Sequence, residues 1–158
     1  MTKPGLKIAG EYGKMLPAFG SHQEATSALF ALRDSLLASA VLLEQKSSKF
    51  RADFTPESLN QLEILIFDSL DVQDFDRLGV DQPTFERIIG MYFGEVYVRN
   101  VPGAEWFVVE YAFEQGRYEI GVRKGPLSLM LTNGLVPKPR DRNIRQKSLL
   151  RLYKRYSG

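Results

Sequence analysis

The spacing of hydrophobic residues changes at Gly103, and this change constrains the fold of the 158-residue chain more than any other feature. Before Gly103, apolar residues recur at intervals of three and four, the spacing of amphipathic helices. After it, "EWFVVEYAF" and "RYEIGVR" alternate apolar with polar residues and flank the turn "EQG", which indicates a β-hairpin. Helices that precede a run of strands predict an α+β fold.

Three N-terminal helices are predicted from their start signals. Ser21 and Glu24 form a capping box, in which each side chain binds a free backbone amide at a helix start. Pro56 stands at the first position of the second helix, where its missing N–H is not needed, and Asp81 precedes the third. The predicted helices cover about 22–46, 56–70 and 82–98.

The C-terminal half is predicted to be an antiparallel three-stranded meander followed by a basic amphipathic helix. The strands cover about 106–113, 118–123 and 127–132, and the final helix covers about 143–156. We expect the helices to pack on this sheet as a single domain, 21–158. Residues 1–20 are predicted to form an irregular or extended arm, with "LKIAG" as its one candidate strand.

Composition excludes several kinds of chemistry. The chain has no cysteine, which rules out thiolate nucleophiles and cysteine zinc sites and favours a reducing cytoplasm. His22, the only histidine, stands at a helix start and is expected to face solvent. The aspartates between residues 68 and 81 lack the spacing of a calcium loop. We therefore predict a cytoplasmic protein without a metal, a cofactor or a membrane-spanning segment.

The third helix has an unusual second face. Gly90 and Gly94 remove side chains from one strip, which allows another backbone or a bulky side chain to approach closely. This pattern predicts a central helix packed on several sides. Glu95 falls between the glycine strip and the apolar face, so its carboxylate is expected to be largely buried and hydrogen-bonded. A structural role for Glu95 is the favoured interpretation.

A catalytic role for Glu95 is the alternative. General acid–base chemistry needs a second group, and the candidates are Glu110 and Glu119 of the predicted hairpin. A small carboxylate-dependent hydrolase is therefore the one enzyme hypothesis that the sequence leaves open.

The C-terminal region is strongly basic. Residues 123–158 carry ten Lys and Arg residues against one acidic residue, whereas residues 1–122 carry eleven basic and eighteen acidic residues. In the final helix the leucines and tyrosines lie on one face, and the basic face holds Lys147, Arg151, Lys154 and Arg155. We favour docking of this helix on its own acidic domain. An acidic protein partner or a nucleic acid are the alternatives.

Several motifs of the chain resemble a group of small uncharacterised bacterial domains. These motifs are "DFTPESLNQLE", "MYFGEVYVRN", a hairpin that opens with Trp106, and "SLLRLYKRY", and together they span about residues 53–156. The turn "PGAEW" departs from the Gly-Gly-Trp expected there. The resemblance implies an α+β domain of bacterial origin and supports structural roles for Gly94, Glu95 and Trp106. Our favoured function is a non-catalytic interaction or binding module.

Overall fold

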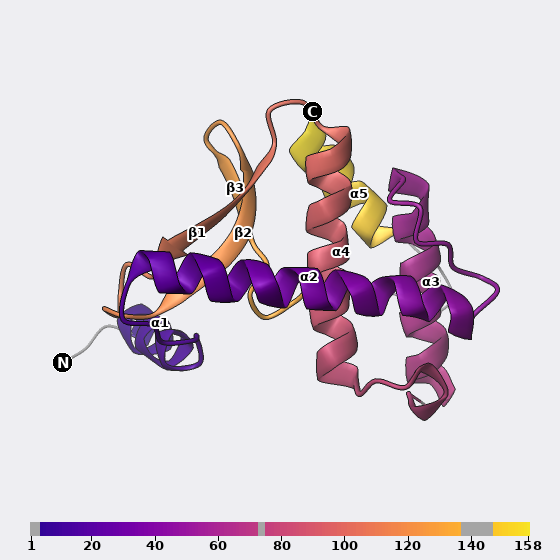
Figure 1. The fold of residues 1–158 in the computed structure, drawn as a ribbon, viewed down its shortest axis with the longest axis horizontal. Coiled ribbons are helices and arrows are strands. Elements are labelled where there is room, and N and C mark those ends of the chain that lie inside the picture. The colour runs from indigo at the N-terminus through magenta and orange to yellow at the C-terminus, as the bar shows by residue number, and fades with distance from the viewer. Residues whose placement is uncertain (1–3, 73–74, 137–146) are drawn as a thin grey trace.

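The computed structural model describes residues 4–72, 75–136 and 147–158, and it confirms the α+β fold (Figure 1). The helical elements are α1 (Pro4–Lys14), α2 (His22–Lys46), α3 (Pro56–Val72), the short 3-10 helix η1 (Asp76–Leu78), α4 (Gln82–Asn100) and α5 (Ser148–Ser157). The strands are β1 (Glu105–Glu110), β2 (Tyr118–Lys124) and β3 (Leu127–Met130).

Helix α2 runs across the molecule from the sheet to α3 (Figure 1). Its predicted limits match the structure because the start signal is local: Ser21 Oγ accepts the Glu24 backbone N–H at 3.1 Å. By length and composition alone α2 could also cross a membrane, which the sequence analysis did not expect. In the structure its buried residues belong to the hydrophobic core, namely Ala25, Leu29, Leu36, Ala40 and Leu43.

Helix α4 is the central helix, since it contacts α2, α3, α5, β1 and β2. A Cβ at Gly90 would lie 2.9 Å from Gly134 Cα, so the backbone after β3 occupies the space that a side chain would need. A Cβ at Gly94 would collide with the indole of Trp106 and lie 2.8 Å from Leu131 Cδ1. The two glycines therefore let the sheet side of the molecule approach α4 closely.

The sheet is the predicted antiparallel meander, with strand order β1-β2-β3. Trp106 pairs with Val122 and Val109 pairs with Glu119. The outer edge of β1 is covered by the start of α2, where His22 Nε2 donates a hydrogen bond to the Val108 carbonyl at 2.8 Å. Among the described strands β1 lies at the edge of the sheet, so this contact satisfies a carbonyl that β2 does not reach.

The prediction of an irregular or extended arm over 1–20 is wrong for its first part, because Pro4–Lys14 is helix α1. The segment contains three glycines, which lower its intrinsic helix propensity, so its sequence does not predict a helix. Tertiary contacts offset that cost: the Tyr12 ring packs edge-on against Tyr111, and the Tyr12 hydroxyl donates to Glu119 at 2.5 Å. Arg117 also donates to the Leu16 carbonyl at 2.6 Å. The first four residues of the predicted final helix, 143–146, lie outside the described residues.

Candidate functional site

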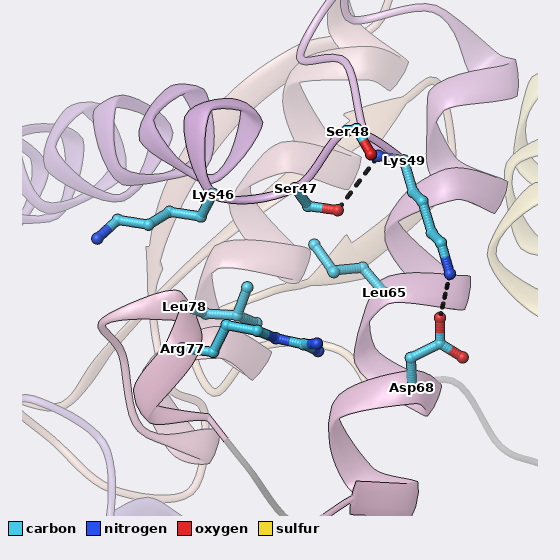
Figure 2. Close-up of a pocket in the computed structure, with 8 residues that line it drawn as sticks. All are labelled: Lys46, Ser47, Ser48, Lys49, Leu65, Asp68, Arg77 and Leu78. Atoms are coloured by element: carbon cyan, nitrogen blue, oxygen red, sulfur yellow. Dashed lines mark hydrogen bonds and ion pairs between the residues drawn. The ribbon is translucent and has the colours of Figure 1, made fainter.

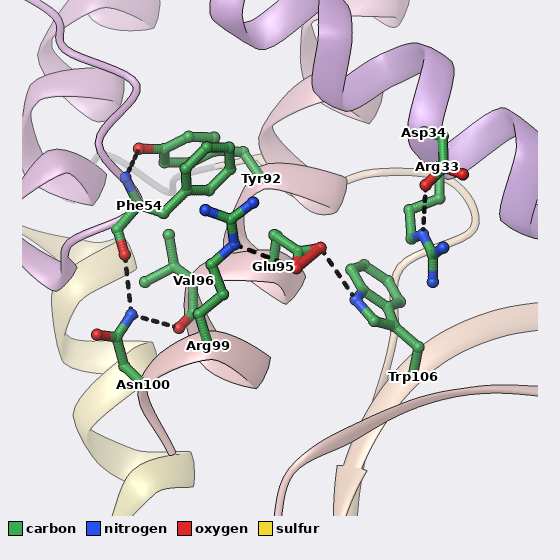
Figure 3. A network of polar contacts seen from close by, with 9 residues as sticks. All are labelled: Arg33, Asp34, Phe54, Tyr92, Glu95, Val96, Arg99, Asn100 and Trp106. Atoms are coloured by element: carbon green, nitrogen blue, oxygen red, sulfur yellow. Dashed lines mark hydrogen bonds and ion pairs between the residues drawn. The ribbon is translucent and has the colours of Figure 1, made fainter. Parts of the chain in front are cut away.

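Glu95 lies near the end of α4, where it binds one partner from its own helix and one from the sheet (Figure 3). Its side chain is 17% exposed. Arg99 Nε donates to one carboxylate oxygen at 3.4 Å, and Trp106 Nε1 donates to the other at 3.4 Å. Both distances are longer than the roughly 2.7–3.2 Å of typical N–H···O hydrogen bonds, so the two bonds are weak. Glu95 therefore links α4 to the first strand through these contacts.

The residues beside Glu95 hold the loop before α3. Phe54 has a φ of 58°, a left-handed conformation that is unfavourable for a bulky side chain. The Phe54 ring stacks on the Tyr92 ring with centroids 4.9 Å apart. The Cζ atom of the Arg99 guanidinium lies 3.8 Å from the centroid of the Phe54 ring. Asn100 Nδ2 donates to the Phe54 carbonyl at 2.8 Å (Figure 3). These contacts fix a strained residue in place.

A partly buried chain of hydrogen bonds continues from Phe54. Its N–H donates to Tyr92 Oη at 3.0 Å, and the Ser58 hydroxyl donates to the Thr55 carbonyl at 2.6 Å. Because Ser58 has a single hydroxyl hydrogen, the 2.6 Å contact between Tyr92 Oη and Ser58 Oγ must be donated by Tyr92. Burial raises the pKa of Tyr92 above its ordinary value.

The two carboxylates that were candidates to join Glu95, Glu110 and Glu119, lie toward the other end of the hairpin. Glu110 is four residues along β1 from Trp106, a separation of about 13 Å along the strand. There it accepts the Gly116 N–H at 3.0 Å. Glu119, which pairs with Val109, is buried and accepts the Tyr12 hydroxyl. Neither Glu110 nor Glu119 therefore joins Glu95.

Two further groups with catalytic potential serve local structure. His22 is exposed, as expected, and its Nε2 is bound to the edge of β1. Burial, reinforced by the Glu119 carboxylate, raises the pKa of Tyr12 well above its ordinary value. Among the residues that the structure describes, no group of three His, Cys, Asp or Glu side chains could hold a metal ion.

Helix α5 is fixed to the body through its apolar face and both of its ends. Leu149 and Tyr153 are buried, and α5 contacts α3 and α4. The Leu149 backbone N–H and the Ser148 hydroxyl donate to the Glu63 carboxylate, the former at 3.1 Å. At the other end, the Tyr97 hydroxyl donates to the Tyr156 carbonyl at 2.9 Å. Glu63 thereby holds the start of α5, and Tyr97 holds its end.

Glu63 is a residue that sequence reasoning missed. It is 1% exposed and lies on α3 beside Leu62 and Ile66. Because most of the circumference of α3 is apolar, a carboxyl group within it is a signal of a buried polar group that needs a hydrogen-bond partner. The sequence does not name its partner, since Leu149 lies 86 residues further along the chain.

The cations of α5 face solvent. Lys147, Arg151, Lys154 and Arg155 are all exposed, although their helix packs on α3 and α4. Within the described residues, none of the four forms an ion pair with an acidic side chain. The α5 side chains that contact the domain are those of its leucines, its tyrosines and Ser148, and its basic face lies in solvent.

Comparison with known proteins places this arrangement in one family. The family model described as "Uncharacterised protein YwmA" matches residues 18–157. The uncharacterised protein YwmA of Bacillus subtilis (strain 168) is 28% identical over 134 residues, which are 83% of this chain and 85% of that protein. No solved structure matches the chain.

Proposed function

The chain belongs to the YwmA family of uncharacterised proteins, and we propose that it is a non-catalytic interaction module that binds an acidic segment of a partner protein through α5. The observation that carries this proposal is the orientation of α5. Its apolar face is anchored in the domain, whereas Arg151, Lys154 and Arg155 face solvent.

The anchoring of α5 makes its basic face a defined surface. Glu63 binds the start of the helix and Tyr97 binds its end, so the cations are carried by a helix of fixed position. A rigid surface loses less conformational freedom on binding than a mobile tail does. Ten helical residues extend about 15 Å, which suits a short acidic segment.

The candidate catalytic groups support a non-catalytic role. Glu95 accepts from Arg99 and Trp106, and Glu119 accepts from Tyr12. A general acid or base must reach its substrate, and here each carboxylate is engaged within the fold. A hydrolase that uses Glu95 is therefore the weaker hypothesis.

An acidic protein fits α5 better than a nucleic acid does. Proteins that bind single strands offer aromatic rings on which bases stack, but Tyr153 is buried and Tyr156 is half-buried against the domain. Residues 1–122 carry an excess of seven acidic residues, which repels an extended polyanion. A short acidic peptide can contact α5 without lying along that acidic surface.

The proposal is tested by fluorescence anisotropy with a labelled peptide rich in Asp and Glu, and with single-stranded and duplex oligonucleotides. The α5 variant combines Lys147→Gln, Arg151→Gln, Lys154→Gln and Arg155→Gln. Its control combines Lys14→Gln, Arg51→Gln and Arg87→Gln, three exposed cations elsewhere. We expect saturable peptide binding that weakens as salt rises, persists in the control and disappears in the α5 variant.

Two results contradict the proposal. Nucleic acid that binds at about micromolar Kd in ~150 mM salt, while the peptide does not, would assign α5 to nucleic acid. Peptide binding that is equal in the α5 variant and in the control would remove α5 from the interaction.

A further inference from the structure

A cleft of about 480 Å³ lies where the end of α2 and its following loop meet α3 and η1 (Figure 2). Three cations from separate positions line it: Lys46 from the last turn of α2, Lys49 from the loop and Arg77 from η1. Ser47 and Ser48 add two hydroxyl groups, and Asp68 is the single carboxylate of the lining. The cleft is separate from both Glu95 and α5.

The charge of this cleft contrasts with its surroundings. Residues 1–122 contain only eleven basic residues against eighteen acidic ones, and three of those eleven meet here. Among the lining residues alone, three cations and one carboxylate leave an excess of two positive charges. A phosphomonoester carries nearly two negative charges at neutral pH, so the two are complementary.

The geometry leaves Lys49 able to engage a ligand. Its ammonium lies 3.5 Å from the Asp68 carboxylate, longer than the roughly 2.7–2.9 Å of a strong charge-assisted bond. The Lys49 side chain is 69% exposed. Figure 2 shows the Arg77 guanidinium extending from η1 toward α3, on the side where Lys49 reaches Asp68. Both cations therefore serve one region of the cleft.

The floor of the cleft is apolar. Leu65 and Leu78 line it and are each 3% exposed. An apolar wall lowers the local dielectric constant and strengthens the attraction between a bound anion and the cations above it. The volume falls within the roughly 300–1,000 Å³ of small-molecule sites, which exceeds the needs of a lone phosphate. It can hold a phosphate together with an apolar body.

We propose that the cleft formed by Lys46, Lys49, Arg77 and the Ser47–Ser48 hydroxyls binds a small, soluble phosphomonoester. Lys49, Arg77 and the hydroxyls hold the phosphate, and Leu65 and Leu78 contact the organic part. The Lys46 ammonium points away from Lys49 and Arg77 (Figure 2) and contributes only its charge. This ligand site is independent of the protein-binding surface assigned to α5.

The test is a titration of the full chain with phenyl phosphate, inorganic phosphate and phenol. Calorimetry measures the affinity of each compound, and amide chemical shifts locate its binding site. We expect phenyl phosphate to bind most tightly, phosphate more weakly and phenol not at all. The shifts should centre on residues 47–49. Vesicles of phosphatidylcholine with phosphatidate form a separate arm, in which sedimentation measures binding to a lipid-borne phosphate.

The variants are Lys49→Gln and Arg77→Gln, with Arg51→Gln as an exposed control outside the lining. Each cleft variant should weaken phenyl phosphate binding about tenfold, since each removes a charge-assisted contact, whereas the control should bind like the original protein. Arg77→Lys keeps the charge and should retain most of the affinity. Circular dichroism confirms that each variant is folded.

The proposal is overturned if phenyl phosphate does not saturate the protein at concentrations up to about 10 mM. A Kd above that concentration corresponds to a binding free energy weaker than about −3 kcal/mol. It is also overturned if the cleft variants bind as well as the control, if phenol binds equally, or if only the vesicles bind. Loss of phenyl phosphate binding in the α5 variant would place the phosphate on α5 instead. Peptide binding by α5 does not depend on any of these results.

Discussion

The Glu63 carboxylate of α3 accepts the backbone N–H of Leu149 at 3.1 Å, so a side chain 86 residues away acts as the N-terminal cap of α5. Lys147, the residue at the cap position itself, has a left-handed backbone and offers no side-chain bond. A carboxylate at a helix start binds free N–H groups and interacts favourably with the positive end of the helix dipole. The position of α5 therefore depends on a residue of another helix.

Replacement of Glu63 with alanine should lower the free energy of unfolding by about 1–3 kcal/mol, since the Leu149 N–H and the Ser148 hydroxyl would lose their acceptor. Urea denaturation followed by circular dichroism measures this loss. Glu44→Ala, at an exposed site on α2, is the control and should change stability by less than about 0.5 kcal/mol. Equal effects of the two substitutions would show that α5 docks without the carboxylate.

Replacement of Glu95 with alanine should cost about 1 kcal/mol. Both of its hydrogen bonds are 3.4 Å long, and water can reach the half-buried Trp106 N–H that would be freed. Glu105→Ala, which removes an exposed ion pair with Arg123, should have a smaller effect. The same urea titration compares them, and an unchanged midpoint for Glu95→Ala would contradict a structural role for Glu95.

The glycines of α4 should tolerate substitution in a defined order. Gly94→Leu should destabilise far more than Gly94→Ala, because the indole of Trp106 and Leu131 fill the space above Gly94. Gly90→Ala should also destabilise, since it meets the Gly134 backbone. Gly10→Ala has open space and should stabilise by up to about 1 kcal/mol. Stabilisation by all three alanine changes would refute close packing around α4.

Removal of the Tyr92 hydroxyl should weaken the loop before α3. Tyr92→Phe leaves the Phe54 N–H without its acceptor and breaks the bond to the buried Ser58. We expect a loss of about 1–3 kcal/mol in the free energy of unfolding. Tyr156→Phe is the matched control, because among the described residues no hydrogen bond to its hydroxyl is seen. A neutral Tyr92→Phe would mean that water replaces these contacts.

Stability should fall as the pH rises above about 10, the ordinary pKa of tyrosine. Burial raises the pKa of Tyr12 and Tyr92, so the unfolded chain loses these protons first and alkaline pH favours it. The stabilisation that comes from the raised pKa values is fully present below about pH 10, the pKa of the unfolded tyrosines. It is lost as the pH rises toward the pKa of the folded state. Urea midpoints between about pH 8 and 11 measure the slope, which should be shallower in Tyr92→Phe. An identical slope would show that Tyr92 does not contribute.

Local signals in the sequence predicted some elements accurately, and distant contacts account for the errors. The limits of α2 follow from the capping contact between Ser21 and Glu24, which are three residues apart. Helix α1 was missed because its support comes from Glu119, 107 residues beyond Tyr12. The strand predicted to continue to residue 113 ends at Glu110, and the Tyr111 N–H then binds the Arg117 carbonyl across a wider turn.

The candidate site shows the same division. Spacing alone placed Glu95 between two faces of its helix and placed Gly94 in a close-packed strip. The identity of the partners, Arg99 and Trp106, required the tertiary structure. The cleft beside Lys49 was not predicted, because its lining comes from three segments that no local pattern connects.

The position of Trp106 gives this protein a built-in optical probe. As the only tryptophan, it carries nearly all of the long-wavelength fluorescence, and its ring lies over Gly94 of α4 with Arg33 of α2 5.4 Å from its centroid. Emission therefore reports the junction between the sheet and two helices, whereas far-ultraviolet circular dichroism reports the helices themselves. Unfolding curves that coincide by both signals would identify a single cooperative unit, and curves that separate would reveal a state in which the sheet has left α4.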